Sequence, residues 1–309
     1  MYNEEQKIRF MKDCAGSIAV GDLMTSIFKR ISQYEEIAEK DICEFSENEA
    51  QEVIDKMSGI RKLTSTSTLS VLKHYGKWCL ENNIDGAIDG ILLTKIPGSE
   101  RIKKSLVSGP LQLQACLDAV FEPESEKTID CIYRCYFWLA FSGMHEVDAF
   151  NVKRSEVDLS KMLIYHGADE YYIYREGIGA FYNASTLNEF KYKHPNYSNI
   201  ITRDRKDTVL LLSGIKATPS TNSWRAELSK RCKEAEKDGK LTVDISFKRI
   251  QLSGIFYRMY ERERAGIPVD FSSIVDNIFY KNSNSNVYRL RLIRSYTDDY
   301  ERWKTAFNS

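Results

Sequence analysis

Several features that mark other classes of protein are missing from this sequence of 309 residues. No run approaches the roughly 20 consecutive apolar residues that a membrane-spanning helix needs. The first residues, from Met1 to Lys7, are polar and acidic with no apolar segment behind them, unlike a secretory signal peptide. Neither sign of charge prevails, because 44 basic residues balance 44 acidic ones. We therefore expect a soluble, cytoplasmic protein that does not contact membranes.

Metal-binding and disulfide patterns are missing as well. The seven cysteines are scattered and odd in number, and none belongs to a Cys-x-x-Cys pair. Cys131 and Cys135 lie four residues apart on an apolar stretch, where packing is far more common than metal binding when no other ligand is near. The chain has only four histidines. The sequence therefore predicts no metal site, no disulfide framework and no cofactor.

The balance of charge also bears on nucleic acid. A DNA-binding surface normally carries an excess of basic residues, so a net charge of zero leaves open a protein-interaction module that does not bind DNA. The distribution is uneven, however. Four cations and no acid lie between Lys281 and Arg294, whereas eight acidic residues lie between Glu35 and Glu52. A basic surface is therefore expected in the C-terminal part of the chain.

The length is sufficient for two domains, each with its own core, and for a further small segment. Residues 1–45 are expected to form an N-terminal helical segment, residues 46–108 a helical domain and residues 109–309 a larger domain, with a linker among the glycines and prolines of residues 97–110. Short strands are expected at 162–165, 170–174 and 179–182. The predicted fold class is mainly α with a small antiparallel β-sheet (α+β).

Two local patterns predict helices in the second segment. Ser46 and Glu49 are spaced as a capping box at the start of a helix. A loop rich in serine and threonine, residues 59–68, is expected to precede another helix, on which Tyr75 and Trp78 belong to the core.

The most informative segment runs from residue 132 to residue 158. An apolar run, 132–141, ends in Ser-Gly-Met-His at 142–145, followed by Asp148 and by Glu-Val-Asp at 156–158 before a strand-like stretch. Without gaps, this resembles a signature of the tyrosine recombinase (phage integrase) family, in which an apolar helix leads into a Thr-Gly-Leu-Arg turn, a glutamate and an Asp-Ile-Asp strand entry. His145 stands where the resemblance places the first catalytic arginine.

A second segment extends the resemblance. Ser246-Phe247-Lys248-Arg249 resembles the family's His-x-x-Arg box, with Arg249 kept and Ser246 in place of the histidine. Further on, Tyr280 or Lys281 replaces a second histidine, and the nucleophile position is matched best by Tyr288, with Tyr296 and Tyr300 as alternatives. The resemblance covers most of the C-terminal two-thirds of the chain. It implies a helical core-binding domain followed by a domain like the catalytic one.

These substitutions bear on catalysis. A tyrosine recombinase attacks a DNA phosphodiester with a tyrosine hydroxyl, and arginines stabilise the phosphate oxygens because a guanidinium is planar and permanently charged. Histidine, with an unperturbed pKa of about 6.5, is mostly neutral at cellular pH. The family's general-acid lysine is also missing, since Arg175 is the only cation between Met162 and Phe190. We therefore expect no catalysis, with the degenerate positions at His145, Ser246, Arg249, Tyr280 and Tyr288.

The resemblance also implies where DNA would bind. The expected contacts are hydroxyls and cations near helix starts and in the two motifs, namely Lys62, Thr64, Thr66, Ser67, His145, Lys248, Arg249, Lys281 and Arg289. Hydroxyls and helix N-termini are natural phosphate ligands. Plainer alternatives stay open, because Thr66 or Ser67 could simply cap a helix, and His145 could cap carbonyls or pack.

The resemblance favours a sequence-specific double-stranded DNA-binding protein without catalytic activity, acting as a phage or prophage transcriptional repressor in lysogeny. A narrower resemblance is to the repressors of SPβ-type phages. The alternative is a divergent active recombinase in which His145 and Arg249 support Tyr288. Two further partners are considered, a phage regulatory protein or peptide and a second copy of the chain bound through the aromatic stripe of residues 296–307. That stripe could equally fold back on its own domain.

Overall fold

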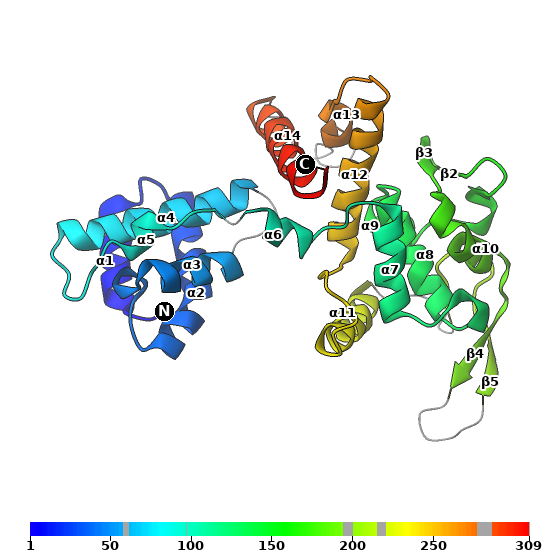
Figure 1. The fold of residues 1–309 in the computed structure, drawn as a ribbon, viewed down its shortest axis with the longest axis horizontal. Helices are drawn as coiled ribbons and strands as arrows, with labels where there is room; N and C mark the ends of the chain where they lie inside the picture. The colour runs from blue at the N-terminus through cyan, green and yellow to red at the C-terminus, as the bar shows by residue number, and fades with distance from the viewer. Residues whose placement is uncertain (58–61, 97, 194–199, 215–220, 277–285, 309) are drawn as a thin grey trace. The chain divides into compact units, whose positions relative to one another are not determined.

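The computed structural model describes residues 1–57, 62–96, 98–193, 200–214, 221–276 and 286–308. The chain divides into two compact units, one formed by residues 1–102 with 285–302 and the other by residues 103–284 with 303–309. Figure 1 shows the helices and strands of both. Across the described residues, no helix combines the length and the hydrophobicity that crossing a membrane demands.

Helices make up the first unit. They are α1 (Glu4–Cys14), α2 (Ile18–Ala38), the 3-10 helix η1 (Ile42–Glu44), α3 (Glu47–Met57), α4 (Lys62–Glu81) and α5 (Gly90–Leu93). The Ser17 hydroxyl caps α2 by accepting from the backbone N–H of Val20. The predicted capping box of α3 is confirmed, because the backbone N–H of Ser46 donates to the Glu49 carboxylate and that of Glu49 donates to the Ser46 hydroxyl.

One core joins these helices. Phe10 of α1, Phe28 of α2 and the rings of Tyr75 and Trp78 on α4 lie in contact and are buried. The prediction that Tyr75 and Trp78 are core residues is confirmed. The boundary expected after residue 45 does not separate two cores, because α1 and α2 each have a single apolar face and both cover it with the helices that follow.

The stretch rich in serine and threonine is helical where the structure describes it. Because α4 begins at Lys62, Thr64, Thr66 and Ser67 lie within its first two turns rather than in a loop before it. Neither Thr66 nor Ser67 stands at an N-cap, so the capping alternative was wrong for both. Ser65 and Thr68 are buried on the side of α4 that continues into Leu72, and this buried side is what makes the segment helical.

Helices and two small sheets form the second unit. Its helices are α6 (Ser99–Lys103), which spans the boundary, then α7 (Pro110–Val120), α8 (Asp130–Phe141), α9 (Glu146–Ala149), α10 (Ile178–Thr186), α11 (Thr221–Lys237), α12 (Phe247–Arg264) and α13 (Ser272–Ile274). The 3-10 helices are η2 (Glu124–Glu126), η3 (Arg154–Glu156) and η4 (Arg175–Gly177). The last helix, α14 (Asn286–Asn308), has residues in both units.

The sheets are antiparallel. β1 (Val157–Asp158), β2 (Leu163–His166) and β3 (Asp169–Tyr172) pair in that order, and β4 (Glu189–Lys193) pairs with β5 (Ile200–Asp204) in a separate hairpin. The predicted class, mainly α with a small antiparallel β-sheet, is confirmed. Residues 179–182, however, belong to α10 and not to a strand, because Ala180, Phe181 and Ala184 are buried at helical spacing.

The core of the second unit is built around α8. All of its residues except Tyr133 are buried, including Cys131 and Cys135, so the packing role predicted for these two cysteines is confirmed. α12 packs so closely against this helix that a Cβ added at Gly254 would overlap the carbonyl of Phe141. The close approach holds the C-terminal end of α8 in a fixed position beside α12.

The C-terminal aromatic stripe folds back onto its own chain at Trp303. The indole N–H of Trp303 donates to the carbonyl of Val107 at 3.1 Å, and its ring packs against Phe256 and Tyr260. Of the two arrangements left open for this stripe, the structure therefore shows the intrachain one for Trp303.

Candidate nucleic-acid interface

The turn of residues 142–145 is held from two sides. Ser142 ends α8, and its hydroxyl donates to the carbonyl of Tyr172 in β3 at 2.6 Å. From α12, the amide of Gln251 donates to the carbonyls of Gly143 and Met144, and the guanidinium of Arg258 donates to that of Ser142 at 3.0 Å. Gly143 has a φ of 88°, the left-handed region that glycine adopts without strain. The turn is therefore a rigid platform for the residue that follows it.

That residue is His145, the N-cap of α9. Its side chain makes no capping hydrogen bond and is exposed. Neither plain alternative for His145 is therefore observed, since it neither caps backbone groups nor packs in the core. Its imidazole faces solvent from a fixed backbone, which suits a surface contact but does not supply the permanent charge of an arginine.

The next residue, Glu146, anchors the turn to α11. The guanidinium of Arg225 donates to both carboxylate oxygens of Glu146, and the hydroxyl of Tyr136 donates to Oε1 at 2.6 Å. Burial raises the pKa of Glu146, but the hydrogen bonds from Arg225 and Tyr136 outweigh it and hold the pKa below its ordinary value. Sequence reasoning missed this Arg225–Glu146 clamp, because no motif places α11 beside α9.

The second motif lies at the N-terminus of α12. Ser246 is the N-cap, is exposed and makes no side-chain capping bond, and Lys248 is exposed in the first turn of the helix. Arg249 forms an ion pair with Asp244, and its Nη1 also donates to the Asp244 carbonyl at 2.9 Å. The arginine that the motif retains is thus partly neutralised by its own chain.

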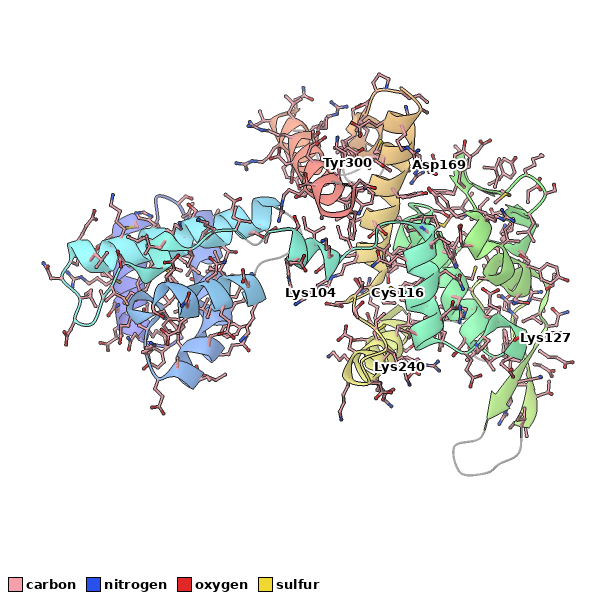
Figure 2. The ribbon with its side chains drawn as sticks, in the orientation of Figure 1. Lys104, Cys116, Lys127, Asp169, Lys240 and Tyr300 are labelled. Atoms are coloured by element: carbon pink, nitrogen blue, oxygen red, sulfur yellow. The ribbon has the colours of Figure 1, made fainter. Side chains whose placement is uncertain are left out.

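Acidic residues stand where the resemblance places a lysine. The hairpin of β2 and β3 carries Asp169 and Glu170 at its end, both exposed, and Figure 2 shows Asp169 on the side of the hairpin near α12. With His145 and Arg258 they line a recess of about 480 Å³. A general acid of the lysine type is missing from this hairpin, and the carboxylates disfavour a phosphate group at this position.

The remaining predicted positions are dispersed. Tyr288 lies in the first turn of α14 with 46 % of its surface exposed, and Arg289 beside it is half-buried. Tyr296 and Tyr300 are 2 % and 1 % exposed, so neither hydroxyl is available as a nucleophile on this surface. The predictions for Tyr280 and Lys281 lie outside the described residues.

In the first unit, α4 offers a second polar surface. Thr64 and Thr66 are exposed and Ser67 is half-buried, and Ser70, His74 and Lys77 continue the exposed side of the helix. Lys62 is the first residue of α4. Sequence reasoning did not notice the charge pattern that accompanies this surface. No acidic residue occurs from Lys56 to Leu80, although residues 1–102 contain 17 acidic residues against 13 basic ones.

Among the exposed residues of α4 within this interval are Thr66, Ser70, His74 and Lys77. We call these four residues the α4 face. Hydroxyl, imidazole and ammonium groups donate hydrogen bonds to phosphate oxygens. The four residues of the face include no carboxylate, and the nearest one along α4, that of Glu81, stands 3.5 Å from the Lys77 ammonium at the end of the helix. The α4 face is therefore chemically suited to a nucleic-acid backbone.

Comparisons with known proteins agree with the character of the first unit. Residues 1–81 match the family described as MrpR, N-terminal core-binding domain, a span that runs from the first residue to the last residue of α4. Residues 1–81 are therefore similar to that core-binding domain. No curated protein matches the chain.

Two solved structures resemble the whole chain at low identity. The crystal structure of XerA recombinase has a TM-score of 0.41 and 12 % sequence identity, covering 99 % of this chain and 98 % of that chain. The Tn1549 transposon integrase, solved in complex with circular intermediate DNA, has a TM-score of 0.37 and 10 % identity, covering 93 % of each chain. Neither likeness is close enough to carry a conclusion about the activity of this chain.

Proposed function

We propose that this chain is a sequence-specific double-stranded DNA-binding protein that uses a recombinase-like scaffold without cutting DNA, and that it acts as a phage transcriptional repressor. One observation carries the proposal. The turn of residues 142–145 is held rigidly, but the described residues around it depart from the family's catalytic pattern: His145 stands in the arginine position, Arg249 is paired with Asp244, and Asp169 and Glu170 occupy the hairpin.

The first unit supports the binding part of the proposal. The match of residues 1–81 to a core-binding domain and the α4 face both favour contact with the DNA backbone. Lys248 and His145 are exposed in the second unit and supply further donors. Since the proposed contacts include many neutral donors, we expect affinity to depend on base sequence and DNA shape as well as on charge.

The alternative is a divergent active recombinase. It is favoured by Tyr288, whose hydroxyl-bearing side chain is 46 % exposed, and by the retained Arg249. Against it, the loss of one donor to a transition-state charge typically costs on the order of 100-fold in rate, and here an arginine and a lysine are both replaced. Such losses within one transition state are not independent of one another.

A nicked-duplex trapping experiment separates the two functions. DNA that binds the chain is first selected from a pool of random duplexes, and a nicked version is then incubated with the protein. The proposal expects a gel shift and no covalent adduct, with the shift retained in Tyr288→Phe. A covalent adduct that disappears in Tyr288→Phe would establish the enzyme. Repression of a reporter promoter carrying the selected site tests the regulatory role, and an unrepressed reporter would contradict it.

Association with other proteins belongs to the same proposal. Trp303 is used within the chain, but Val287 and Leu290 near the start of α14 are 78 % and 62 % exposed. We therefore place self-association through α14 at this end of the helix. Sedimentation of the wild type and of Val287→Ser/Leu290→Ser tests it, because a complex that survives the double substitution would exclude this surface.

A further inference from the structure

The recess that contains His145 is bordered on one side by the edge strand β3. Asp169, Glu170 and Tyr171 of β3 form one side of it, and Arg258 and Arg262 of α12 lie among the residues of the other side. All of these residues belong to the second unit. The outer edge of a β-sheet therefore borders a cavity of about 480 Å³. We call this cavity the β3 recess.

β3 is an edge strand. Within the described residues its only strand neighbour is β2, with His166 opposite Asp169 and Ile164 opposite Tyr171. A two-residue turn makes the first of these a hydrogen-bonded pair, and hydrogen-bonded pairs alternate along an antiparallel ladder. The backbone N–H and carbonyl of Glu170 then point away from β2. No backbone partner for either occurs in the part of the chain that the structure describes. The next outward-facing carbonyl of β3, that of Tyr172, already accepts from the Ser142 hydroxyl, so the open part of this edge lies at Glu170 and can accept a short strand.

The charge of the recess selects what can bind there. Asp148, Asp169 and Glu170 make no ion pair among the described residues, and Arg258 is directed at the carbonyl of Ser142. Burial, together with the charges of Asp169 and Asp148, raises the pKa of Tyr171 to about 12. These three carboxylates outnumber the two arginines of the recess, Arg258 and Arg262, so the β3 side of the recess attracts a cationic side chain more strongly than a phosphate.

We propose that the β3 recess binds an extended segment of a partner protein that carries lysine or arginine side chains and adds to β3 as a fourth strand. The backbone of the segment pairs with Glu170, and its alternate side chains enter the recess, where cations meet Asp148 and Asp169. Apolar residues of the segment can contact Ile255 and Met259, which also line the cavity. The proposal does not depend on DNA binding.

Binding of a short synthetic peptide to the full-length chain, without DNA, tests the proposal. The probe is a fluorescein-labelled peptide of alternating lysine and valine, measured by fluorescence anisotropy. Asp169→Asn/Glu170→Gln should weaken its binding by about tenfold, because two interfacial charges are removed. The matched control is Glu189→Gln/Asp204→Asn, which removes the same charge from two exposed residues on the other hairpin and should leave binding unchanged.

Two further measurements separate strand addition from simple charge attraction. The same peptide with alternate backbone nitrogens methylated keeps its charge but loses the donors that pair with β3, and it should bind at least about tenfold more weakly. Hydrogen exchange of residues 169–172 should slow on binding the unmodified peptide. Equal binding of both peptides, or equal weakening in the two charge variants, would overturn the proposal. Because no DNA is present, either result leaves the DNA-binding proposal to its own test.

Discussion

Arg225 and Glu146 form the contact that fixes the turn before His145 to α11. Glu146 is 7 % exposed in its side chain and accepts from Arg225 and from Tyr136. Replacing Arg225 by methionine leaves a buried carboxylate with one remaining partner. We expect the free energy of unfolding to fall by about 1–3 kcal/mol, measured by urea denaturation. The lower end is favoured, because the Arg225 side chain is 54 % exposed and solvent screens its charge.

A matched control for this clamp lies on the same helix. Lys230 is exposed and stands 4.0 Å from Glu234, four residues along α11. Lys230→Met should change the free energy of unfolding by less than about 0.5 kcal/mol, as is usual for an exposed ion pair. An equal loss in the two variants would show that α11 responds to any loss of charge and that Arg225 has no special role.

Glu35 carries the clearest pH dependence in the first unit. It is fully buried, with Lys7 Nζ at 2.6 Å and Asp41 on the other side of that ammonium. Burial is the main cause that raises its pKa from 4.5 to about 7, and Asp41 adds to it, while pairing with Lys7 opposes the rise. The folded state therefore holds this proton more tightly than the unfolded chain does.

The sign of the effect follows from linkage. Because the folded pKa lies above the unfolded one, stability from this group is complete below about pH 4.5 and is lost as the pH rises to about 7, by on the order of 3 kcal/mol. Hydrogen exchange of α2 and α4 amides between pH 5 and pH 8 measures it, after correction for the intrinsic exchange rate. Glu35→Gln should flatten the profile, and identical profiles for the two proteins would refute the assignment.

At the residue scale, the sequence indicated which residues belong to the motifs, but not which side chains these residues contact. It singled out Arg249 and His145, because their spacing to an apolar helix and to a glycine turn can be read from the chain. It could not show that Arg249 pairs with Asp244, or that Arg225 reaches Glu146, since both depend on where a side chain outside the motif lies in space. Arg225 and Glu146 are also 79 residues apart, and pairing at such a separation leaves no periodic signal in the sequence.

At the scale of secondary structure, the packing of α12 against α8 depends on Gly254. A Cβ there would overlap the carbonyl of Phe141, so Gly254→Ala must push two central helices apart. We expect the free energy of unfolding to fall by about 1–3 kcal/mol, as in other overpacked cores. Gly21 in α2 has nothing closer than 3.9 Å around the same added atom. Gly21→Ala should therefore raise stability by about 0.5–1 kcal/mol through helix propensity alone.

Thermal and urea denaturation of the two alanine variants check this pair. The two variants should change the free energy of unfolding in opposite directions. The substitution is the same and both glycines lie in helices, so only the surroundings of the added Cβ differ. A stabilising Gly254→Ala would mean that α8 and α12 are not packed as closely as the structure shows.

Helices with a strong hydrophobic signal in the sequence could be predicted. Elements whose type depends on tertiary packing could not. The run of residues 132–141 is apolar on all sides and is a buried helix as expected. The strand expected at residues 179–182 is wrong, because Ala180 and Ala184 are buried on one side of a helix. The start of α4 was also misplaced, because serine and threonine favour loops when their burial is unknown.

At the scale of the whole molecule, a net charge of zero conceals an uneven distribution. Residues 1–102 are acidic overall but contain the acid-free interval from Lys56 to Leu80, and residues 103–309 carry 31 basic residues against 27 acidic ones. The sequence alone indicated three parts, with divisions after residues 45 and 108. A core shared by residues on both sides of residue 45 is invisible in composition. DNA binding by such a chain requires local basic surfaces, since the whole molecule provides no general attraction.

If DNA binds to a local basic surface, the salt dependence of the affinity should change when a lysine of that surface is replaced. Lys77 lies on the α4 face and is 65 % exposed, whereas Lys237 is an exposed lysine at the end of α11. On the selected duplex, Lys77→Gln should lower affinity several-fold and reduce the slope of log affinity against log salt by about 1, because one phosphate contact and its released counterion are lost. Lys237→Gln removes the same charge and should leave that slope unchanged. If both variants reduce the slope equally, binding responds only to total charge and the α4 face is not the contact surface.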